Sequence, residues 1–239
     1  MNIVLIGAQG SGKGTQAALL TQTLAIHHVA SGDLFRKAQA EKTRLGVQAK
    51  AYLDRGELVP DEITIAMVLQ HVEKLIHTRG ILFDGFPRTV AQAHALDHGL
   101  QRFNRKLDLA VYLNVPRTEL LFRLSGRYIC RAKQHVYHQH TRPPKVAGIC
   151  DLDGSELYQR TDDVGDAVQT RLDLFFQETI QLLDYYRVQG KLVEINGNQS
   201  VDDVLAEFLA TLRSSSHSID KFSVPAWQQD ETTLDLRLA

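Results

Sequence analysis

The apolar residues of the chain gather in short runs that alternate with longer stretches of helical pattern. Runs rich in Val, Ile and Leu predict strands at Asn2–Ile6, Ile81–Asp84, Leu109–Val115 and Lys191–Ile195, with a weaker one near Ile26–Ala30. None alternates cleanly between apolar and polar residues, which is typical of strands buried on both faces of a parallel sheet. The pattern predicts an α/β fold with right-handed βαβ crossovers and helices around the sheet.

The last helical pattern is the clearest. Its apolar positions recur at helical spacing and are Val201, Val204, Leu205, Phe208, Leu209 and Leu212. Ser200 precedes them, with Asp203 three residues later, so we expect a capping box in which Asp replaces the usual Glu. A helix is therefore predicted to begin just after Ser200.

Two stretches interrupt the alternation of strands and helices. Residues 30–59 are helical in pattern but supply no core strand, whereas residues 126–163 hold aromatic, His, Pro and Gly residues typical of short strands and turns. The segment 214–239 is expected to be a flexible or loosely docked tail. The remaining ranges form the predicted core, and they are 1–29, 60–125 and 164–213.

Composition and charge narrow the class of protein. With 239 residues, 44% hydrophobic and 23% charged, the chain is typical of a globular protein, and its formal net charge of -1 favours neither nucleic acid nor anionic membranes. It has no apolar run of the ~18–20 residues that a membrane helix needs. The N-terminus lacks a charged leader, so we expect a cytoplasmic protein, and a monomer.

A glycine-rich loop from Gly7 to Thr15 follows the first predicted strand and opens a helix. Glycines let successive backbone N–H groups turn inward toward phosphate oxygens, and the helix N-terminus adds partial positive charge. Lys13 supplies a full charge for β- and γ-phosphates. Gly14 stands where Ser or Thr follows Lys in the general pattern, so Thr15 is either a Mg²⁺ ligand or a phosphate contact.

Several motifs together resemble one family. GAQGSGKGTQ, SGDLFR at 31–36, LFDGFPRT at 82–89 and GRY followed by a PPK insert resemble adenylate kinases of the bacterial long-lid type, within the nucleoside monophosphate kinases. The resemblance covers residues 1–213. It implies a P-loop parallel-sheet core, a helical AMP-binding insert at 30–59 and a small β-rich lid at 126–163 that moves over ATP.

The resemblance also implies the reaction, which is reversible phosphoryl transfer from ATP to AMP with Mg²⁺, giving 2 ADP and maintaining adenine nucleotide balance. One alternative is a kinase acting on another nucleoside monophosphate or using GTP as donor. Another is a non-catalytic nucleotide-binding module, which predicts loss of Lys13 or of the arginines. Neither is lost here.

Site residues follow from the resemblance by position in this sequence. The expected AMP contacts are Ser31, Arg36, Glu57, Leu58, Val59, Gly85, Phe86, Pro87, Arg88, Gln92, Arg160 and Arg171. The expected ATP contacts are Gly10, Ser11, Gly12, Lys13, Gly14, Thr15, Arg123, Arg127, Val136, Tyr137 and Gln199. The predicted catalytic residues are Lys13, Arg88, Arg127, Arg160 and Arg171.

Arginines suit this reaction because two repelling anions must be held in line and kept from water, while little covalent chemistry is needed. The planar guanidinium makes bidentate bonds and keeps its charge at any working pH. Asp84, at the carboxyl end of a strand, is a candidate to hold Mg²⁺ through water. Asp162 and Asp163 resemble lid-hinge acids, or are a pair at a helix start.

Both cysteines, Cys130 and Cys150, fall in the predicted lid. The resemblance implies zinc ligands at positions 130, 133, 150 and 153, but Lys133 has no acceptor, so His135 is its natural substitute. The expected set is Cys130, His135, Cys150 and Asp153, holding a structural Zn²⁺. A metal-free lid held by hydrogen bonds and a Cys130–Cys150 disulfide are the alternatives, the disulfide being disfavoured in a reducing cytoplasm.

Overall fold

The computed structural model describes residues 1–53, 59–160, 163 and 165–215. The expected AMP contacts Glu57 and Leu58, the acid Asp162 and residues 216–239 of the predicted tail lie outside the described residues.

Strands and helices alternate through the first and last parts of the chain, as the pattern predicts. In chain order, the elements up to the lid are β1 (Asn2–Ile6), α1 (Lys13–Leu24), β2 (His27–Ala30), α2 (Ser31–Ala40), α3 (Arg44–Leu53), α4 (Asp61–Glu73), β3 (Ile81–Asp84), α5 (Val90–Gln101), β4 (Leu109–Asn114) and α6 (Arg117–Ser125). The remaining elements are β5 (Arg127–Cys130), β6 (Val136–His138), β7 (Leu157–Tyr158), α7 (Asp166–Val188), β8 (Leu192–Asn196) and α8 (Val201–Ser215).

A five-stranded parallel sheet forms the centre, in the order β2-β3-β1-β4-β8. The prediction of an α/β fold with a parallel sheet is confirmed. β1 and β3 have the predicted bounds, and the weak strand near Ile26–Ala30 is β2. β4 ends one residue earlier than predicted, at Asn114, and β8 begins and ends one residue later than predicted. The apolar pattern does not determine which residue makes the last hydrogen bond of a strand.

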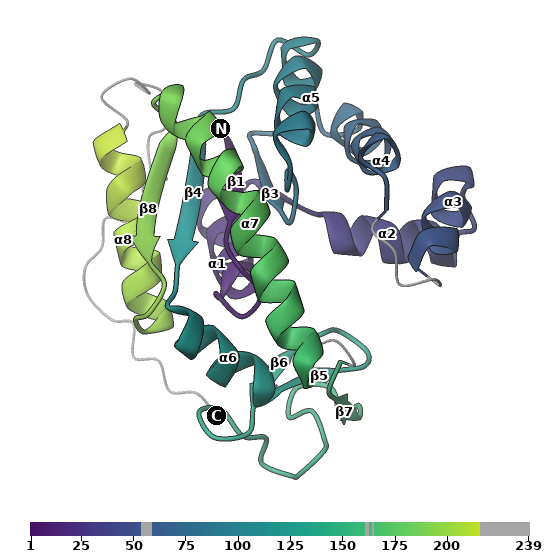
Figure 1. Cartoon of the computed structure of the whole chain (residues 1–239), viewed down its shortest axis with the longest axis vertical. Coiled ribbons are helices and arrows are strands. Elements are labelled where there is room, and N and C mark those ends of the chain that lie inside the picture. The colour runs from purple at the N-terminus through teal and green to yellow at the C-terminus, as the bar shows by residue number, and fades with distance from the viewer. Residues whose placement is uncertain (54–58, 161–162, 164, 216–239) are drawn as a thin grey trace.

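Apolar side chains on the two faces of the sheet pack under different helices. One core is formed with α4, α5 and α7 and includes the fully buried Phe83, Phe86 and Tyr186. The other is formed with α1 and α8 and is centred on Phe208 and Leu20. Figure 1 shows α7 crossing in front of the sheet. Burial on both faces explains why the strands lack clean alternation.

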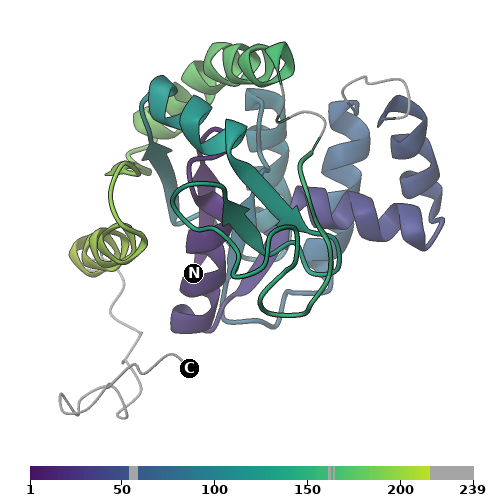
Figure 2. The same ribbon diagram turned by 90° about the horizontal axis from the view of Figure 1, so that it is seen from below.

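The helices within residues 30–59 and the short strands within residues 126–163 project from the core in different directions (Figure 1). The first range holds α2 and α3, which extend to one side (Figure 2). The second holds a three-stranded antiparallel sheet in the order β6-β5-β7. Its own core is small and consists of Cys130, Tyr137, Cys150 and Leu157, with Tyr128 packed against it.

The helix predicted after Ser200 is confirmed as α8, which extends to Ser215. The Ser200 hydroxyl accepts from the backbone N–H of Asp203 at 3.2 Å, as a helix cap does. The Asp203 carboxylate accepts a hydrogen bond from that hydroxyl at 2.6 Å. In a capping box the acid would instead accept from the backbone N–H of Ser200. None of the described helices has an apolar stretch long enough to cross a membrane.

Candidate active site

The ends of three adjacent strands bring the sequence motifs together. The parallel register pairs Ala30 with Asp84 and Asp84 with Leu5, so β2, β3 and β1 finish at one edge of the sheet. Ser31, Gly85 and the glycine loop follow directly at this edge. Because β1 lies between β3 and β4, where the strand order reverses, the edge is also the position where parallel α/β sheets bind ligands.

The glycine loop is shaped by its glycines. Gly12, the N-cap of α1, has φ 94°, and Gly10 has φ 82°, conformations that other residues rarely adopt. A Cβ at Gly7 would lie 2.7 Å from the Ser11 hydroxyl, so only glycine fits there without a shift. Among the described residues no side chain caps α1, and its first turn has no acidic residue. The N-terminal amides of α1 can therefore serve an anion.

Lys13 lies in the loop and donates to the carbonyl oxygens of Gly7, at 2.5 Å, and Ala8, at 2.8 Å. The pKa of Lys13 is lowered from 10.5 to about 8, mainly by burial and also by the charges of Arg88, Arg127 and Arg171, while Asp84 opposes the shift. Three of the predicted catalytic arginines are thus close enough to act on Lys13. The concentrated positive charge suits a polyanionic ligand.

Beside the loop, Ser31 and Arg88 meet at Gly85. The Ser31 hydroxyl donates to the Gly85 carbonyl at 2.8 Å, and Arg88 Nε donates to the same oxygen at 2.9 Å. Gly85 has φ 72°, and a Cβ there would lie 2.9 Å from Ser31 Oγ. The Phe86–Pro87 peptide bond, one residue further along the chain, is cis. Burial and the neighbouring charge of Arg171 lower the pKa of Arg88, while Asp84 and Glu178 raise it.

Gln92, on α5, is only 4% exposed, which excludes the interpretation of a surface glutamine. Its Oε1 accepts from the Arg88 backbone N–H at 2.8 Å, and its Nε2 donates to Asp61 at 2.6 Å. Gln92 therefore lies beside the Ser31–Arg88 corner and is held from two sides.

Asp84 faces the loop from the end of β3. His28 Nε2 lies 3.4 Å from Asp84 Oδ2. Burial raises the pKa of Asp84, but the hydrogen bond from His28 and the charges of Lys13 and Arg88 outweigh burial and hold the pKa below its usual range. The carboxylate is thus ionised at neutral pH, as a group that orders the water of a divalent cation must be.

Two predicted catalytic arginines converge on one buried acid. Arg127 binds Asp163 with Nε to Oδ2 at 2.8 Å and Nη2 to Oδ1 at 2.6 Å, and Arg171 reaches Oδ1 at 3.3 Å. The Asp163 side chain is fully buried. The interpretation of Asp163 as a helix-start residue is wrong, because α7 begins at Asp166 with Gly165 as its N-cap. Asp163 instead joins the lid strand β5 to α7.

The other arginines contact less buried partners. Arg36 pairs with Asp33 within α2, and Arg123 Nε donates to Glu119 at 2.7 Å within α6. Arg160 Nη2 donates to Gln134 Oε1 at 3.0 Å inside the lid. Arg36 therefore lies on α2, Arg123 on α6 and Arg160 in the lid, outside the sheet edge formed by β1, β2 and β3.

The four predicted metal ligands gather in the lid. One ligand atom from each of Cys130, His135, Cys150 and Asp153 lies within 4.8 Å of the others. Cys130 Sγ is 3.1 Å from Asp153 Oδ2, and His135 Nδ1 is 3.3 Å from Cys150 Sγ and 3.4 Å from Asp153 Oδ2. Tetrahedral zinc with bonds of about 2.0–2.3 Å needs ligand atoms about 3.3–3.8 Å apart, so the cluster fits with small adjustments.

Both cysteines are free thiols, so the disulfide alternative is wrong. Burial opposes ionisation of Cys130, but hydrogen bonds from the Ser155 hydroxyl and the Lys133 backbone N–H lower the pKa of this thiol. Lys133 contributes its backbone at 3.3 Å from Cys130 Sγ. A chelating arrangement is therefore present, together with hydrogen bonds that a metal-free lid would use.

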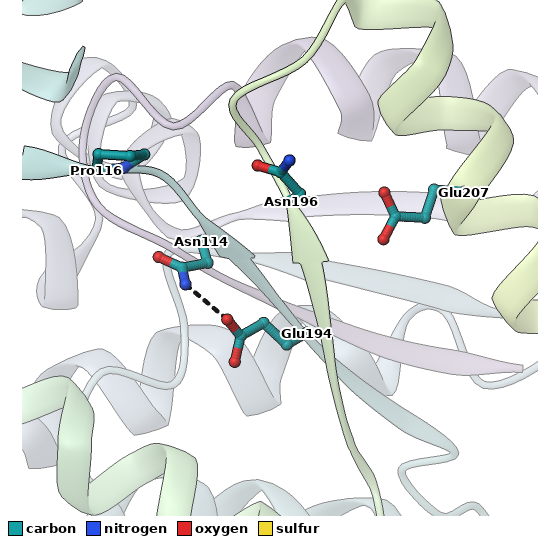
Figure 3. Close-up of a pocket in the computed structure, with 5 residues that line it drawn as sticks. All are labelled: Asn114, Pro116, Glu194, Asn196 and Glu207. Atoms are coloured by element: carbon teal, nitrogen blue, oxygen red, sulfur yellow. Dashed lines mark hydrogen bonds between the residues drawn. The ribbon is translucent and has the colours of Figure 1, made fainter.

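Val136 is exposed and Tyr137 is buried on β6, where the Tyr137 hydroxyl accepts from the Asp151 N–H at 2.8 Å. Gln199 donates to Glu207 at 2.6 Å. A groove of about 430 Å³ lies nearby, at the ends of β4 and β8. It is lined by Asn114, Pro116, Glu194, Asn196 and Glu207, which Figure 3 shows. Its two carboxylates, from Glu194 and Glu207, disfavour phosphate within the groove.

A phosphate-binding loop, a second basic corner beside it and a further pair of arginines define a P-loop phosphotransferase with two anionic ligands. Residues 5–191 match the protein family described as adenylate kinase. The chain is 46% identical over 207 residues to the adenylate kinase of Bacillus subtilis, covering 87% of this chain and 95% of that one. The adenylate kinases of Streptomyces griseus (48% over 216 residues, 90% and 99%) and Staphylococcus aureus (44% over 212 residues, 89% and 99%) are similar.

The chain therefore belongs to the adenylate kinase family. The predictions that it is an enzyme and an ATP:AMP phosphotransferase are confirmed by this membership. The sequence did not indicate three polar partners of the site. His28 contacts Asp84, Asp61 contacts Gln92, and Asp163 lies between Arg127 and Arg171. His28 and Asp61 carry no motif, and only the sheet register and the packing of α4 on α5 bring them to the site.

Proposed function

We propose that the edge formed by β1, β2 and β3 binds ATP on the glycine loop and AMP at the Ser31–Arg88 corner, and that it transfers the γ-phosphoryl group between them. The observation that carries this assignment is the register that ends β2 and β3 beside β1, which sets the two basic sites next to each other. Gly10, Ser11, Gly12, Lys13, Gly14 and Thr15 would hold the ATP phosphates.

The AMP side is built from the corner and its surroundings. Ser31, Gly85, Phe86, Pro87 and Gln92 would enclose AMP, with Val59 near it, and Arg36 and Arg88 would bind its phosphate. The AMP phosphate is already an anion, so no strong general base is needed. Arg88 suits its part because its Nε already donates to the Gly85 carbonyl at the corner, and its fork can bind two phosphate oxygens at once.

The lid side supplies charge to the transferring group. Arg127 and Arg171 would exchange part of their contact with Asp163 for phosphate oxygens, while Arg160 would leave Gln134 and Arg123 would leave Glu119. Val136, Tyr137 and Gln199 would lie beside the ATP base. Each arginine is already paired, so the ligand replaces an existing partner and does not have to order a free side chain.

The residues present also fit Mg²⁺, which ATP carries. Asp84 would hold it through water, because the carboxylate is ionised beside Lys13, and the hydroxyl of Thr15 is a second candidate. When bound, Mg²⁺ neutralises charge that develops on the phosphate oxygens. The role of His28 here is to hold the Asp84 carboxylate by its hydrogen bond.

We propose a structural Zn²⁺ in the lid, held by Cys130, His135, Cys150 and Asp153. The four ligand atoms lie within 4.8 Å of one another, and the lid core of only four buried side chains gains most from such a link. Elemental analysis of the purified enzyme should give about one zinc per chain. Protein free of metal with reactive thiols would instead favour the lid held by hydrogen bonds.

Substrate choice tests the assignment of the reaction. Turnover with AMP, CMP, UMP and GMP as acceptors, each with ATP, and with GTP as donor to AMP, should rank ATP and AMP first. A strong preference for CMP or UMP would assign the site to another nucleoside monophosphate. We propose a cytoplasmic location, which suits two cysteines that form no disulfide, and separately propose that the enzyme is a monomer. Light scattering at the mass of a dimer would contradict the monomer.

A further inference from the structure

Asp61 joins the two helices that flank the Ser31–Arg88 corner. It is the first residue of α4, half-buried, and each of its carboxylate oxygens accepts one hydrogen bond from the start of α5. Oδ1 accepts from Gln92 Nε2 at 2.6 Å, and Oδ2 accepts from the Thr89 hydroxyl at 2.6 Å. Thr89 is the N-cap of α5, and its Oγ1 accepts from the Gln92 N–H at 3.1 Å. One carboxylate thus fixes both the helix cap and the Gln92 side chain.

The partners of Gln92 determine which way its amide points. A carboxylate only accepts hydrogen bonds, so Asp61 requires the amide nitrogen of Gln92. A backbone N–H only donates, so Arg88 requires the amide oxygen, which it reaches at 2.8 Å. In a flipped amide, the Gln92 nitrogen would face the Arg88 N–H and the Gln92 oxygen would face the Asp61 carboxylate. Both contacts would be repulsive, at a residue that is only 4% exposed. The amide keeps one N–H and one lone pair for a ligand.

The direction of an amide distinguishes two classes of purine. Adenine presents its 6-amino donor beside an acceptor ring nitrogen, and an amide in one direction matches both groups. A 6-oxo purine such as hypoxanthine presents an acceptor oxygen at the same place, so it matches only the flipped amide. A site that hydrogen-bonds one pattern leaves buried groups unpaired when it meets the other.

We propose that Asp61 is a positioning residue that holds the Gln92 amide in the direction that favours a 6-amino over a 6-oxo purine nucleoside monophosphate. This inference rests on the proposed function, in which Gln92 binds the base of AMP. Asp61 acts through Gln92 and does not itself touch the substrate. Its effect should therefore appear in base discrimination, which a role in helix stability alone would not change.

The test compares kcat/KM for AMP and for IMP, at saturating ATP, in four variants of the full chain. Asp61→Ala should lower the AMP-to-IMP ratio about tenfold, mainly through KM for AMP, and leave KM for ATP unchanged. Glu62→Ala is the matched control, because Glu62 is an exposed acid in the same first turn of α4. It should leave the ratio unchanged. Asp61→Asn should stay within about twofold of wild type, since Asn Oδ1 can accept from Gln92 while its nitrogen donates to Thr89.

An unchanged ratio in folded Asp61→Ala would overturn the inference, as would an equal loss in Glu62→Ala. If Asp61→Ala does not fold, Asp61→Ser, which keeps a residue suited to a helix N-terminus, is judged by the same ratio. Gln92→Ala separates the two proposals. A ratio that falls in Gln92→Ala but not in Asp61→Ala defeats only the role of Asp61. A KM for AMP that stays unchanged in Gln92→Ala defeats the assignment of Gln92 to the AMP base.

Discussion

The edge of the parallel sheet and the lid hold their basic side chains by different means. At the sheet edge, the glycine loop and the Gly85 corner are set by strand register, and Lys13 and Arg88 bind backbone carbonyls. In the lid, Arg127 is held by the single acid Asp163, and the short strands surround a core of four side chains. The comparison indicates that the edge is built before ligand binds, whereas the lid depends on pairings that the ligand can replace.

Loss of the loop cation should have the largest effect. Lys13→Met should reduce kcat at least about a thousandfold, because the mobile charge for the transferring group disappears, while circular dichroism remains that of the wild type. The control is Lys74→Met, an exposed lysine at the end of α4, which should keep full activity. Activity retained in Lys13→Met would refute the loop as the ATP site.

Loss of the buried acid Asp163 should have the next largest effect, on the stability of the protein. Asp163→Ala removes a fully buried carboxylate that Arg127 binds through two nitrogens and Arg171 reaches through one, so the free energy of unfolding should fall by about 3 kcal/mol. Asp173→Ala removes an exposed partner of Arg117 and should lower the free energy of unfolding much less. Urea unfolding of both variants measures the difference. Equal losses would show that Asp163 contributes no more to stability than an exposed acid and would contradict the contrast between the two regions.

The charge of Lys13 should make stability depend on pH in a defined direction. Its pKa falls from 10.5 to about 8 on folding, so the folded chain binds fewer protons than the unfolded chain between these values. The cost of burying the charge is complete below about pH 8 and disappears as the pH rises through 10.5. Lys13→Met should therefore be more stable than wild type by up to about 3 kcal/mol at pH 7 and by about 1 kcal/mol at pH 10.

Urea unfolding at both pH values measures this difference, with Lys74→Met as the control that should show no trend. A difference that grew with pH would contradict the lowered pKa.

The smallest expected effect tests the metal cluster. His135→Ala removes one predicted zinc ligand and should lower the free energy of unfolding by about 2 kcal/mol in the presence of zinc. Lys133→Ala, two residues away, should change little because the Lys133 contact to Cys130 is made by its backbone. Thermal unfolding with and without a chelator provides the measurement. A chelator that leaves wild type and His135→Ala equally stable would favour the metal-free lid.

The sequence predicts the parts of the molecule that depend on local pattern. The strands of the core are recognisable because both faces are buried, and the glycine loop because its chemistry occupies consecutive residues. The family resemblance implies ligands at positions 130, 133, 150 and 153, and His135 replaces Lys133 in the prediction because Lys133 offers no acceptor. The structure brings Cys130, His135, Cys150 and Asp153 together. Metal binding itself stays a prediction.

What the sequence does not predict is pairing over distance. Nothing near Arg127 indicates that Asp163, 36 residues later, binds both of its nitrogens, or that Asp61 meets Gln92 across 31 residues. The two acids look like ordinary helix-start residues until the packing of α4 on α5 and the contacts of Arg127 and Arg171 with Asp163 are known. The division into core, AMP insert and lid, and the roles of the individual site residues, also stay predictions.

Hydrogen exchange with and without a bisubstrate analogue that joins ATP and AMP tests the contrast between the two regions most directly. The account predicts that amides of the lid strands β5 and β6 gain strong protection when the analogue binds, because its phosphates replace Asp163 and Gln134 as partners of the arginines. Amides of β1, β3 and β4, already ordered by the parallel sheet, should change little. Equal gains across the sheet and lid, or none in the lid, would contradict a prebuilt edge and a lid completed by ligand.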